Sequence, residues 1–513
     1  MGLLDLDLAF AAVEDVPLAG VGPLPYPGLG HLNRIPYAFT GIVQRHFNGM
    51  FSKMGGEGGI RTPGTLSSTH AFQACTFSHS VTSPRGLESG ECITEEIVVQ
   101  GMAPDYDAQV ALPKLRALDI FPIDHDGKPM FVVRDNEGVI EQQLLLPPLA
   151  FVVGCLLSEA ADLSELRLRI AEKFQGTLVS LEELQAVLHD LDQHYLLESD
   201  RLAQRRGELL ADFASSPNRP ARFAGLSYAS SSVQLSVDLE GFYTAEGGAG
   251  RPISSSSGDG IRAVVAPHID FARGGTCYTH AYRQVAERSQ ADVYVILGVA
   301  HVSPTNPLVL SAKNYETPLG TIEADRAIVD ELAKRIPSCF EDEIAHRTEH
   351  SAEFQAVFLK HARPHARFTI VPILCSAFEV HCENRSPSTA PRIEEFLQAL
   401  GEVLRSSEKS VCLVAGVDYA HVGPRFGDPV ELNQALIDWM VAEDNKSLAC
   451  LTKGDAEGFW SSVVADGNRR HVCGLSATYS MLRLLGSQAG TLLKYGYAPD
   501  PAGGIVSFAS AVF

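Results

Sequence analysis

The feature that most constrains the fold is the alternation of two patterns between residues 222 and 513. Short runs of β-branched and other apolar residues recur at 261–266, 292–298, 368–375 and 410–417. The stretches between them carry apolar residues at helical spacing, as in 322–335 and 391–405. Fully apolar strands that alternate with helices are typical of a mixed or parallel sheet covered on both faces. The sequence therefore predicts an α/β fold for residues 222–513, with helices flanking the sheet.

A smaller unit is expected in residues 102–205. The run 121–133 places a polar His-Asp-Gly-Lys turn between apolar segments, which indicates a β-hairpin. Three stretches with helical periodicity follow, at 147–157, 162–174 and 180–197, and the last begins with the capping-box pattern Ser-Leu-Glu-Glu. A hairpin followed by three helices resembles a winged helix, of the PqqD-like kind that binds peptides. The alternative is a unit with a structural role only, which packs against the rest of the protein and binds no peptide.

The remaining segments are polar or irregular. Residues 206–221 contain Ser-Ser-Pro-Asn-Arg-Pro, so we expect a linker. Residues 1–101 hold 15 of the 44 glycines and show poor periodicity. The run 57–83 resembles a spurious translation product read from the strand opposite a tRNA gene, in which case Met102 is the true start. The alternative is a genuine Gly/Pro-rich extension that lacks a fixed structure.

Composition restricts the partners. The chain has 41 Lys and Arg against 62 Asp and Glu, a formal net charge of −21. This charge argues against binding to nucleic acid or to an anionic membrane, because both require a basic face. No stretch of about 20 apolar residues occurs, as a membrane-spanning helix would require, and the first residues lack the basic flank of a secretion signal. We therefore expect a cytoplasmic protein.

A histidine follows three of the expected strands. His268 follows 261–266, His301 follows 292–298, and His421 follows 410–417 together with Asp418. If these strands are parallel, their carboxyl ends lie at one edge of the sheet, where binding sites of α/β proteins form. Imidazoles that converge there suit a divalent metal of the first transition row. Each histidine taken alone is more often a core or capping residue, so the argument depends on their coincidence.

A fourth segment, Glu349-His350-Ser351-Ala352-Glu353, adds further ionisable groups. In the first turn of a helix, Glu349 and Glu353 share one face and His350 lies about 100° away. Such side chains orient ligand imidazoles or move protons. Capping of the helix by the carboxylates is the alternative.

Cys473 is the cysteine most suited to chemistry. It follows Arg469, Arg470 and His471 and precedes a helical pattern at 475–485. A helix amino terminus with cationic neighbours lowers the pKa of a thiol and favours the thiolate. A buried, apolar cysteine is the alternative. The α/β region contains neither a phosphate-binding glycine motif nor the GxSxG turn of serine hydrolases, so neither activity is expected.

Several short motifs follow one another between residues 222 and 513. They are APHID (266–270), ILGVAH (296–301), YETPLG (315–320), EHSAE (349–353), DYAHVG (418–423) and Cys473-Gly474. This series resembles the Memo family (mediator of cell motility), whose bacterial members are called AmmeMemoRadiSam system protein B. The resemblance implies a fold similar to the class III extradiol dioxygenases of the LigB type, which are non-haem iron proteins.

The resemblance also implies a metal site of two histidines and one cysteine, which are His268, His301 and Cys473 in this sequence. The implied metal is Fe(II) or copper, and the implied role is redox chemistry with a radical-SAM protein and an AMMECR-type protein as partners. Four further side chains would line the same pocket as catalytic groups, namely His421, Asp418, His350 and Glu353.

The sequence departs from the family pattern near the implied ligands. Val302 stands where the family has a second histidine, and Asp-Phe at 270–271 replaces Gly-Tyr. The segment after Cys473 also lacks a family histidine. The proposed ligands are retained, whereas these neighbouring positions are not. We therefore expect a redox metalloprotein. A peptide- or partner-binding module with a vestigial metal site and an extradiol-type dioxygenase are the alternatives.

Overall fold

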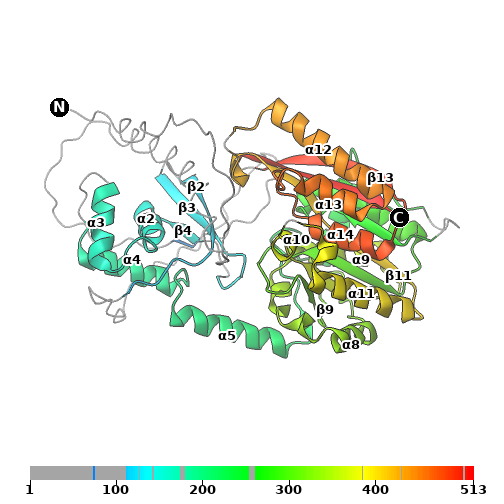
Figure 1. Ribbon diagram of the computed structural model, residues 1–513, viewed down its shortest axis with the longest axis horizontal. Helices are drawn as coiled ribbons and strands as arrows, with labels where there is room; N and C mark the ends of the chain where they lie inside the picture. The colour runs from blue at the N-terminus through cyan, green and yellow to red at the C-terminus, as the bar shows by residue number, and fades with distance from the viewer. Residues whose placement is uncertain are drawn as a thin grey trace.

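The computed structural model describes residues 73–74 and 111–513, apart from 126–127, 141–143, 174–178, 254–259, 384, 429 and 501–502. The expectations for residues 1–101 thus lie outside the described residues, except at Gln73–Ala74. The described chain forms a smaller amino-terminal unit and a larger α/β unit, and helix α5 (Asp200–Ser215) runs from one to the other (Figure 1).

The amino-terminal unit combines an antiparallel sheet with helices. The sheet has the order β1-β4-β3-β2, with strands β1 (Gln73–Ala74), β2 (Asp119–His125), β3 (Lys128–Arg134) and β4 (Leu144–Leu146). Three helices follow it, α2 (Pro148–Leu156), α3 (Leu163–Lys173) and α4 (Leu181–Gln193). The predicted hairpin and three helices are thus present. The predicted capping box is also present, because Ser180 Oγ accepts from Glu183 N at 3.1 Å and Glu183 Oε2 accepts from Ser180 N at 2.8 Å.

The predicted linker is partly helical. Residues 206–215 belong to α5, because Leu202, Leu209 and Phe213 recur at helical spacing and are buried along one side of that helix. Only the residues after Ser215 run as extended chain, and they include the short strand β5 (Asn218–Arg219). This strand pairs in parallel with β9 (Asn314–Tyr315) of the α/β unit.

The α/β unit is built on an eight-stranded mixed sheet. Its strand order is β12-β14-β6-β11-β7-β10-β8, and β13 pairs with β14. The four apolar runs predicted as strands form its centre, β6 (Ala263–Ala266), β7 (Val293–Val299), β10 (Thr369–Cys375) and β11 (Val411–Gly416), and their pairings are parallel. The outer strands are antiparallel, β8 (Leu308–Leu310), β12 (Asp418–Val422), β13 (Thr491–Asp500) and β14 (Gly504–Val512). The predicted α/β class with a flanked sheet is confirmed.

Helices cover both faces of this sheet, because successive side chains of each central strand point to opposite faces. Val293, Val295 and Leu297 pack in one apolar cluster, to which α8 (Arg326–Arg335), α11 (Pro391–Ser406), α13 (Ala456–Val464) and α14 (Leu475–Leu485) contribute. Tyr294 and Ile296 pack in the other, with α6 (Ser232–Thr244), α7 (Phe271–Arg288) and α9 (His350–Ala362). The two remaining helices are α10 (Phe378–Cys382) and α12 (Gln434–Lys453). Within the described ranges, no helix combines the length and apolar character that crossing a membrane requires.

Candidate metal centre

The site lies at the carboxyl edge of the parallel strands. β6 pairs with β11 and β11 with β7, so these three strands end side by side. His268 lies two residues after β6, His301 two residues after β7, and Asp418 two residues after β11. The predicted convergence at one sheet edge is therefore present. His421 differs from the expectation, because it belongs to strand β12 rather than to a loop.

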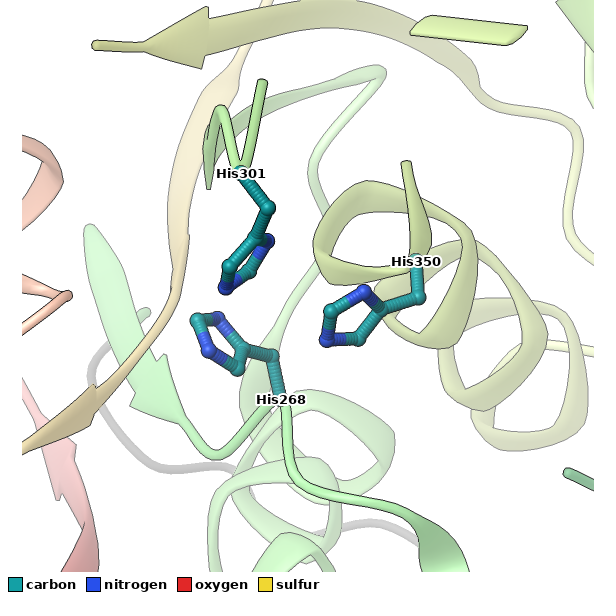
Figure 2. Close-up of side chains that lie close together, drawn as sticks. All are labelled: His268, His301 and His350. Atoms are coloured by element: carbon teal, nitrogen blue, oxygen red, sulfur yellow. The ribbon is translucent and has the colours of Figure 1, made fainter. Parts of the chain in front are cut away.

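Three imidazole rings converge at this edge, as Figure 2 shows. The ring centroids of His301 and His350 are 4.6 Å apart. The ring centroid of His268 lies 5.0 Å from that of His301 and 5.2 Å from that of His350. Each ring offers one nitrogen to a group in which all three nitrogens lie within 4.8 Å of one another. The His268 side chain is 3% exposed, whereas His301 is 33% and His350 28% exposed. The cluster is thus closed on the sheet side and open to solvent on the other.

The protonation of His268 follows from its backbone contacts. Its Nδ1 lies 3.0 Å from the carbonyl oxygen of Gly416, to which it donates, so Nε2 retains a lone pair. Its backbone N–H donates to Asp418 Oδ1 at 3.0 Å. Burial, together with the nearby His301, lowers the pKa of His268 to about 3. A neutral imidazole with an unprotonated Nε2 is the form that ligates a metal.

Glu349 orients the second imidazole. It is the N-cap residue of α9, and its carboxylate accepts from the backbone of Ser351 at 2.8 Å and from the backbone of His301 at 3.0 Å. Both carboxylate oxygens lie 3.0 Å from His301 Nδ1, and one lies 3.3 Å from His350 Nδ1. Burial alone would raise the pKa of Glu349, but the two imidazoles outweigh it and hold the pKa well below its ordinary value. Glu349 thus directs Nε2 of His301 away from itself.

The same contact favours positive charge at His301. Partial burial opposes protonation of this ring, but Glu349 and the thiol of Cys473 together raise its pKa well above the ordinary value. The carboxylate of Glu349 and the sulfur of Cys473 thus both favour positive charge on this ring.

A close approach of helix to sheet places His350. A Cβ atom on Gly298, in β7, would lie 2.6 Å from Ser351 Oγ, so only glycine lets the start of α9 come this near. Ser351 Oγ then accepts from the backbone N–H of Val299 at 2.9 Å. These contacts fix the first turn of α9, and with it His350, against the end of β7.

Cys473 joins the cluster from a distant segment. Its Sγ lies 3.3 Å from Nε2 of His268, and the residue precedes the first turn of α14 as predicted. Burial raises the pKa of this thiol, so the expected lowering is wrong. Two of the cationic neighbours have other partners, because Arg470 is buried in an ion pair with Asp444 and Arg469 lies over the ring of Trp439, 4.5 Å from its centroid.

Asp418 and His421 border the cluster. Asp418 Oδ2 lies 3.6 Å from Nε2 of His268, and burial raises the pKa of Asp418 to about 6. His421 Nδ1 lies 3.1 Å from the carbonyl oxygen of Tyr419 and 3.2 Å from that of His471. Burial lowers the pKa of His421, against an opposing influence of Asp418. Asp418 thus lies beside His268, whereas the ring of His421 contacts the backbone carbonyl groups of Tyr419 and His471.

Glu353 does not reach the cluster. Its carboxylate is fully buried and forms an ion pair with Arg219, which is itself fully buried. It also accepts from the Tyr228 hydroxyl and from the backbone N–H groups of Arg222 and Phe223, at 3.1 and 2.9 Å. Glu353 therefore anchors the chain that enters the α/β unit. Arg219 was not singled out from the sequence, because a lone arginine in a polar linker carries no signal of burial.

The fold and this edge cluster define an α/β protein with a histidine-rich centre, and comparison with known proteins gives its family. Residues 219–512 match the family model described as Memo-like protein. Because the match covers more than half of the chain, the protein belongs to the Memo family.

Two relatives illustrate the extent of the likeness. A MEMO1 family protein of Aquifex aeolicus is 27% identical over 406 residues, which cover 78% of this chain and 99% of the relative. A MEMO1 family protein of Thermus thermophilus is 28% identical over 324 residues, or 63% of this chain and 90% of the relative. The Aquifex match covers far more of the chain than residues 219–512, so the likeness extends into the region before residue 219.

Proposed function

We propose that this protein binds a first-row transition metal ion, iron or copper, through His268, His301 and Cys473. The observation that carries the proposal is the convergence of imidazole nitrogens and a sulfur from separate segments at one sheet edge. The carbonyl partner of His268 Nδ1 leaves a lone pair on its Nε2, and the contact of Glu349 with His301 Nδ1 directs Nε2 of His301 away from the carboxylate. Imidazole and thiolate are ligands that iron and copper accept.

The spacing of the donor atoms fits this proposal. Typical metal–nitrogen and metal–sulfur bonds around a tetrahedral ion place the two donors roughly 3.6 Å apart. The sulfur of Cys473 lies 3.3 Å from His268 Nε2, which is close to that spacing. The imidazole nitrogens of His268, His301 and His350 all lie within 4.8 Å of one another, so His350 is near enough to offer a further nitrogen. We therefore include His350 as a candidate third nitrogen ligand.

A metal ion bound by His268, His301 and Cys473 would supply Lewis-acid or redox chemistry at this edge of the sheet. The chain's own groups prepare that position. Glu349 keeps His301 oriented, and Asp418 holds or releases a proton next to His268 Nε2. His421, placed on β12 beside Asp418, is the second candidate for proton transfer.

The proposed redox role and its partner proteins are taken from the family resemblance rather than from the geometry. We infer a redox role in company with a radical-SAM protein and an AMMECR-type protein. An extradiol-type dioxygenase would reveal itself by catechol-dependent consumption of O₂ by the iron-loaded protein. A peptide- or partner-binding module would instead bind its peptide equally well in the metal-free protein and in a His268→Ala variant.

Metal analysis of protein purified without oxygen tests the proposal. The full chain should contain iron or copper near one equivalent, and His268→Ala and Cys473→Ala should each lose most of it while circular dichroism stays unchanged. Cys450→Ala is the matched control, because Cys450 lies in α12 and is not part of the cluster. Equal metal content in all four proteins would remove the basis of the proposal.

A further inference from the structure

A tight loop of the amino-terminal unit, residues 135–140, is built around Asp135. The Asp135 carboxylate pairs with Arg116 at 2.7 Å and accepts from the backbone N–H groups of Glu137 at 3.0 Å and Ile140 at 2.8 Å. Burial alone would raise the pKa of Asp135, but these contacts hold it below the ordinary value. Gly138 completes the turn with φ of +66°, in the left-handed region. The loop therefore has one preferred shape.

This loop presents its carbonyl groups to the α/β unit. Arg347 donates to the carbonyl oxygens of Glu137 at 3.3 Å and Gly138 at 3.1 Å, and Thr348 Oγ1 donates to that of Asn136 at 2.9 Å. Three successive carbonyls of one unit are thus bonded by two successive side chains of the other. The contact is close, because a Cβ atom on Gly138 would lie 2.4 Å from Thr348 Cγ2.

The bonded residues immediately precede the metal centre. Thr348 is adjacent to Glu349, whose carboxylate holds the ring and backbone of His301 and lies next to His350. The same segment is held from its other side by Arg219, which donates to the carbonyl oxygens of His346 and Glu349, both at 2.6 Å. Residues 346–349 are thus fixed largely by groups that precede the α/β core in the chain.

Two further contacts hold the amino-terminal unit in place, one to helix α5 and one to the α/β unit. The side chain of Glu137 forms a paired contact with Arg206 of α5, at 2.8 and 2.9 Å. Asp119 pairs at 2.7 Å with Arg425, next to Phe426, whose ring lies 5.1 Å from that of His421. The amino-terminal unit therefore contacts the chain beside His350 and the chain beside His421.

We propose that residues 135–140 are a positioning element of the metal centre. By holding Arg347 and Thr348, the loop fixes Glu349 and therefore the orientation of His301. Its effect on metal binding depends on the function proposed above, whereas its effect on Glu349 does not. The amino-terminal unit is on this view part of the site, and a movement of that unit alters the geometry of the ligands.

Gly138→Ala tests the proposal, because the added methyl group meets Thr348. Gly207→Ala is the matched control, since a Cβ at Gly207 in α5 has no atom within 4 Å. The double variant Gly138→Ala/Thr348→Ser removes the Cγ2 methyl that would clash and keeps the hydroxyl that bonds Asn136. If Gly138→Ala does not fold, Thr348→Val replaces it, because valine has the shape of threonine without the donor.

The first measurement is hydrogen exchange in the metal-free proteins. The backbone N–H of His301 is bonded to Glu349, 48 residues away in the chain. Exchange in a peptide covering 299–303 should rise in Gly138→Ala, stay at the wild-type rate in Gly207→Ala, and return toward it in the double variant. Unchanged exchange at 299–303 in a folded Gly138→Ala variant would overturn the inference. If Gly138→Ala does not fold, unchanged exchange in Thr348→Val would overturn it.

The second measurement is titration with Co²⁺, read from its visible absorption. Disturbing a carboxylate that is bonded to a ligand imidazole weakens metal affinity by about tenfold or more. Gly138→Ala should therefore bind Co²⁺ about tenfold more weakly and give an altered cobalt spectrum. Loss of stability alone would leave the spectrum of the bound ion unchanged, and an identical spectrum and affinity in folded Gly138→Ala would count against the inference. Failure of the wild-type chain to bind Co²⁺ and to contain iron or copper after purification without oxygen, with the exchange result as expected, would refute the proposed function and leave the positioning of Glu349 established.

Discussion

At the scale of single residues, two glutamates four positions apart have opposite roles. Glu349 turns outward from the N-cap of α9 to His301, whereas Glu353 turns inward to Arg219. Both side chains are almost completely buried, so exposure does not distinguish them. Their partners do, because one neighbour belongs to the imidazole cluster and the other is a buried guanidinium.

Exchanging each glutamate for glutamine separates these roles. Glu349→Gln should weaken metal binding by about 10- to 100-fold, because an amide is a poorer acceptor for His301 Nδ1–H than a carboxylate. Glu353→Gln should weaken metal binding far less than Glu349→Gln, because Arg219 keeps its bonds to the carbonyl oxygens of His346 and Glu349. It should lower the free energy of unfolding by about 3–5 kcal/mol, because Arg219 would be left without its counter-charge. Metal titration and urea denaturation of both variants check this, and a large loss of affinity in Glu353→Gln would contradict it.

The lowered pKa of the buried His346 ring predicts how the free energy of unfolding depends on pH. It is fully buried, with Nε2 3.0 Å from the carbonyl oxygen of Val309 and Nδ1 2.8 Å from the Tyr315 hydroxyl, and burial lowers its pKa from 6.5 to about 4. The unfolded chain therefore binds a proton more readily, so stability is lost as pH falls from 6.5 toward 4. The loss is about 3 kcal/mol. Urea midpoints of the wild type should fall over this range more than those of His346→Gln, and parallel curves would exclude His346 as the cause.

At the scale of secondary-structure elements, α14 carries Cys473 to the imidazoles. Gly474, its N-cap residue, donates to the carbonyl oxygen of Asp418 at 3.0 Å. A Cβ at Gly474 would lie 2.5 Å from that oxygen and 2.6 Å from Cβ of Val417. The start of α14 can thus approach the chain between β11 and β12 only because residue 474 has no side chain.

Gly474→Ala should therefore move the helix. Overpacking of this kind costs about 1–3 kcal/mol of stability. It should also draw Cys473 away from His268 and weaken metal binding. Thermal unfolding and metal titration measure the two effects. Gly241→Ala in α6 is the control, because no atom lies within 4 Å of the Cβ added there. Tight metal binding by Gly474→Ala would show that the thiol does not depend on this approach.

At the scale of the whole molecule, the two units have separate apolar cores. Leu166 and the other buried residues of the amino-terminal unit form their own cluster, distinct from the two that line the eight-stranded sheet. The contacts described above between the units are polar, as at Asp119 with Arg425 and Asn136 with Thr348. Polar interfaces of this kind allow one unit to unfold before the other.

Tryptophan fluorescence can observe this separation. Both tryptophans of the chain, Trp439 in α12 and Trp460 in α13, belong to the α/β unit. Leu166→Ala removes a fully buried side chain and should destabilise the amino-terminal unit by about 2–5 kcal/mol. It should move the early part of the circular dichroism transition to lower urea concentration but leave the fluorescence transition in place. Val295→Ala, in the α/β unit, should instead move the fluorescence transition to lower urea concentration. Coincident shifts in both signals would indicate a single cooperative unit.

The central strands, their flanking helices and the histidines at the strand ends could be predicted from the sequence, because apolar periodicity and turn-forming residues are local properties. The position of Cys473 just before a helix could be predicted in the same way, and the order of the motifs pointed to the Memo family. Three features emerged only from the folded chain: which carboxylate orients His301, the inward pairing of Glu353, and the separate partners of the arginines near Cys473. These outcomes depend on partners more than a hundred residues distant for Glu353 and on burial for the thiol. Charge and desolvation act through space, and a linear pattern does not record which distant groups share a site.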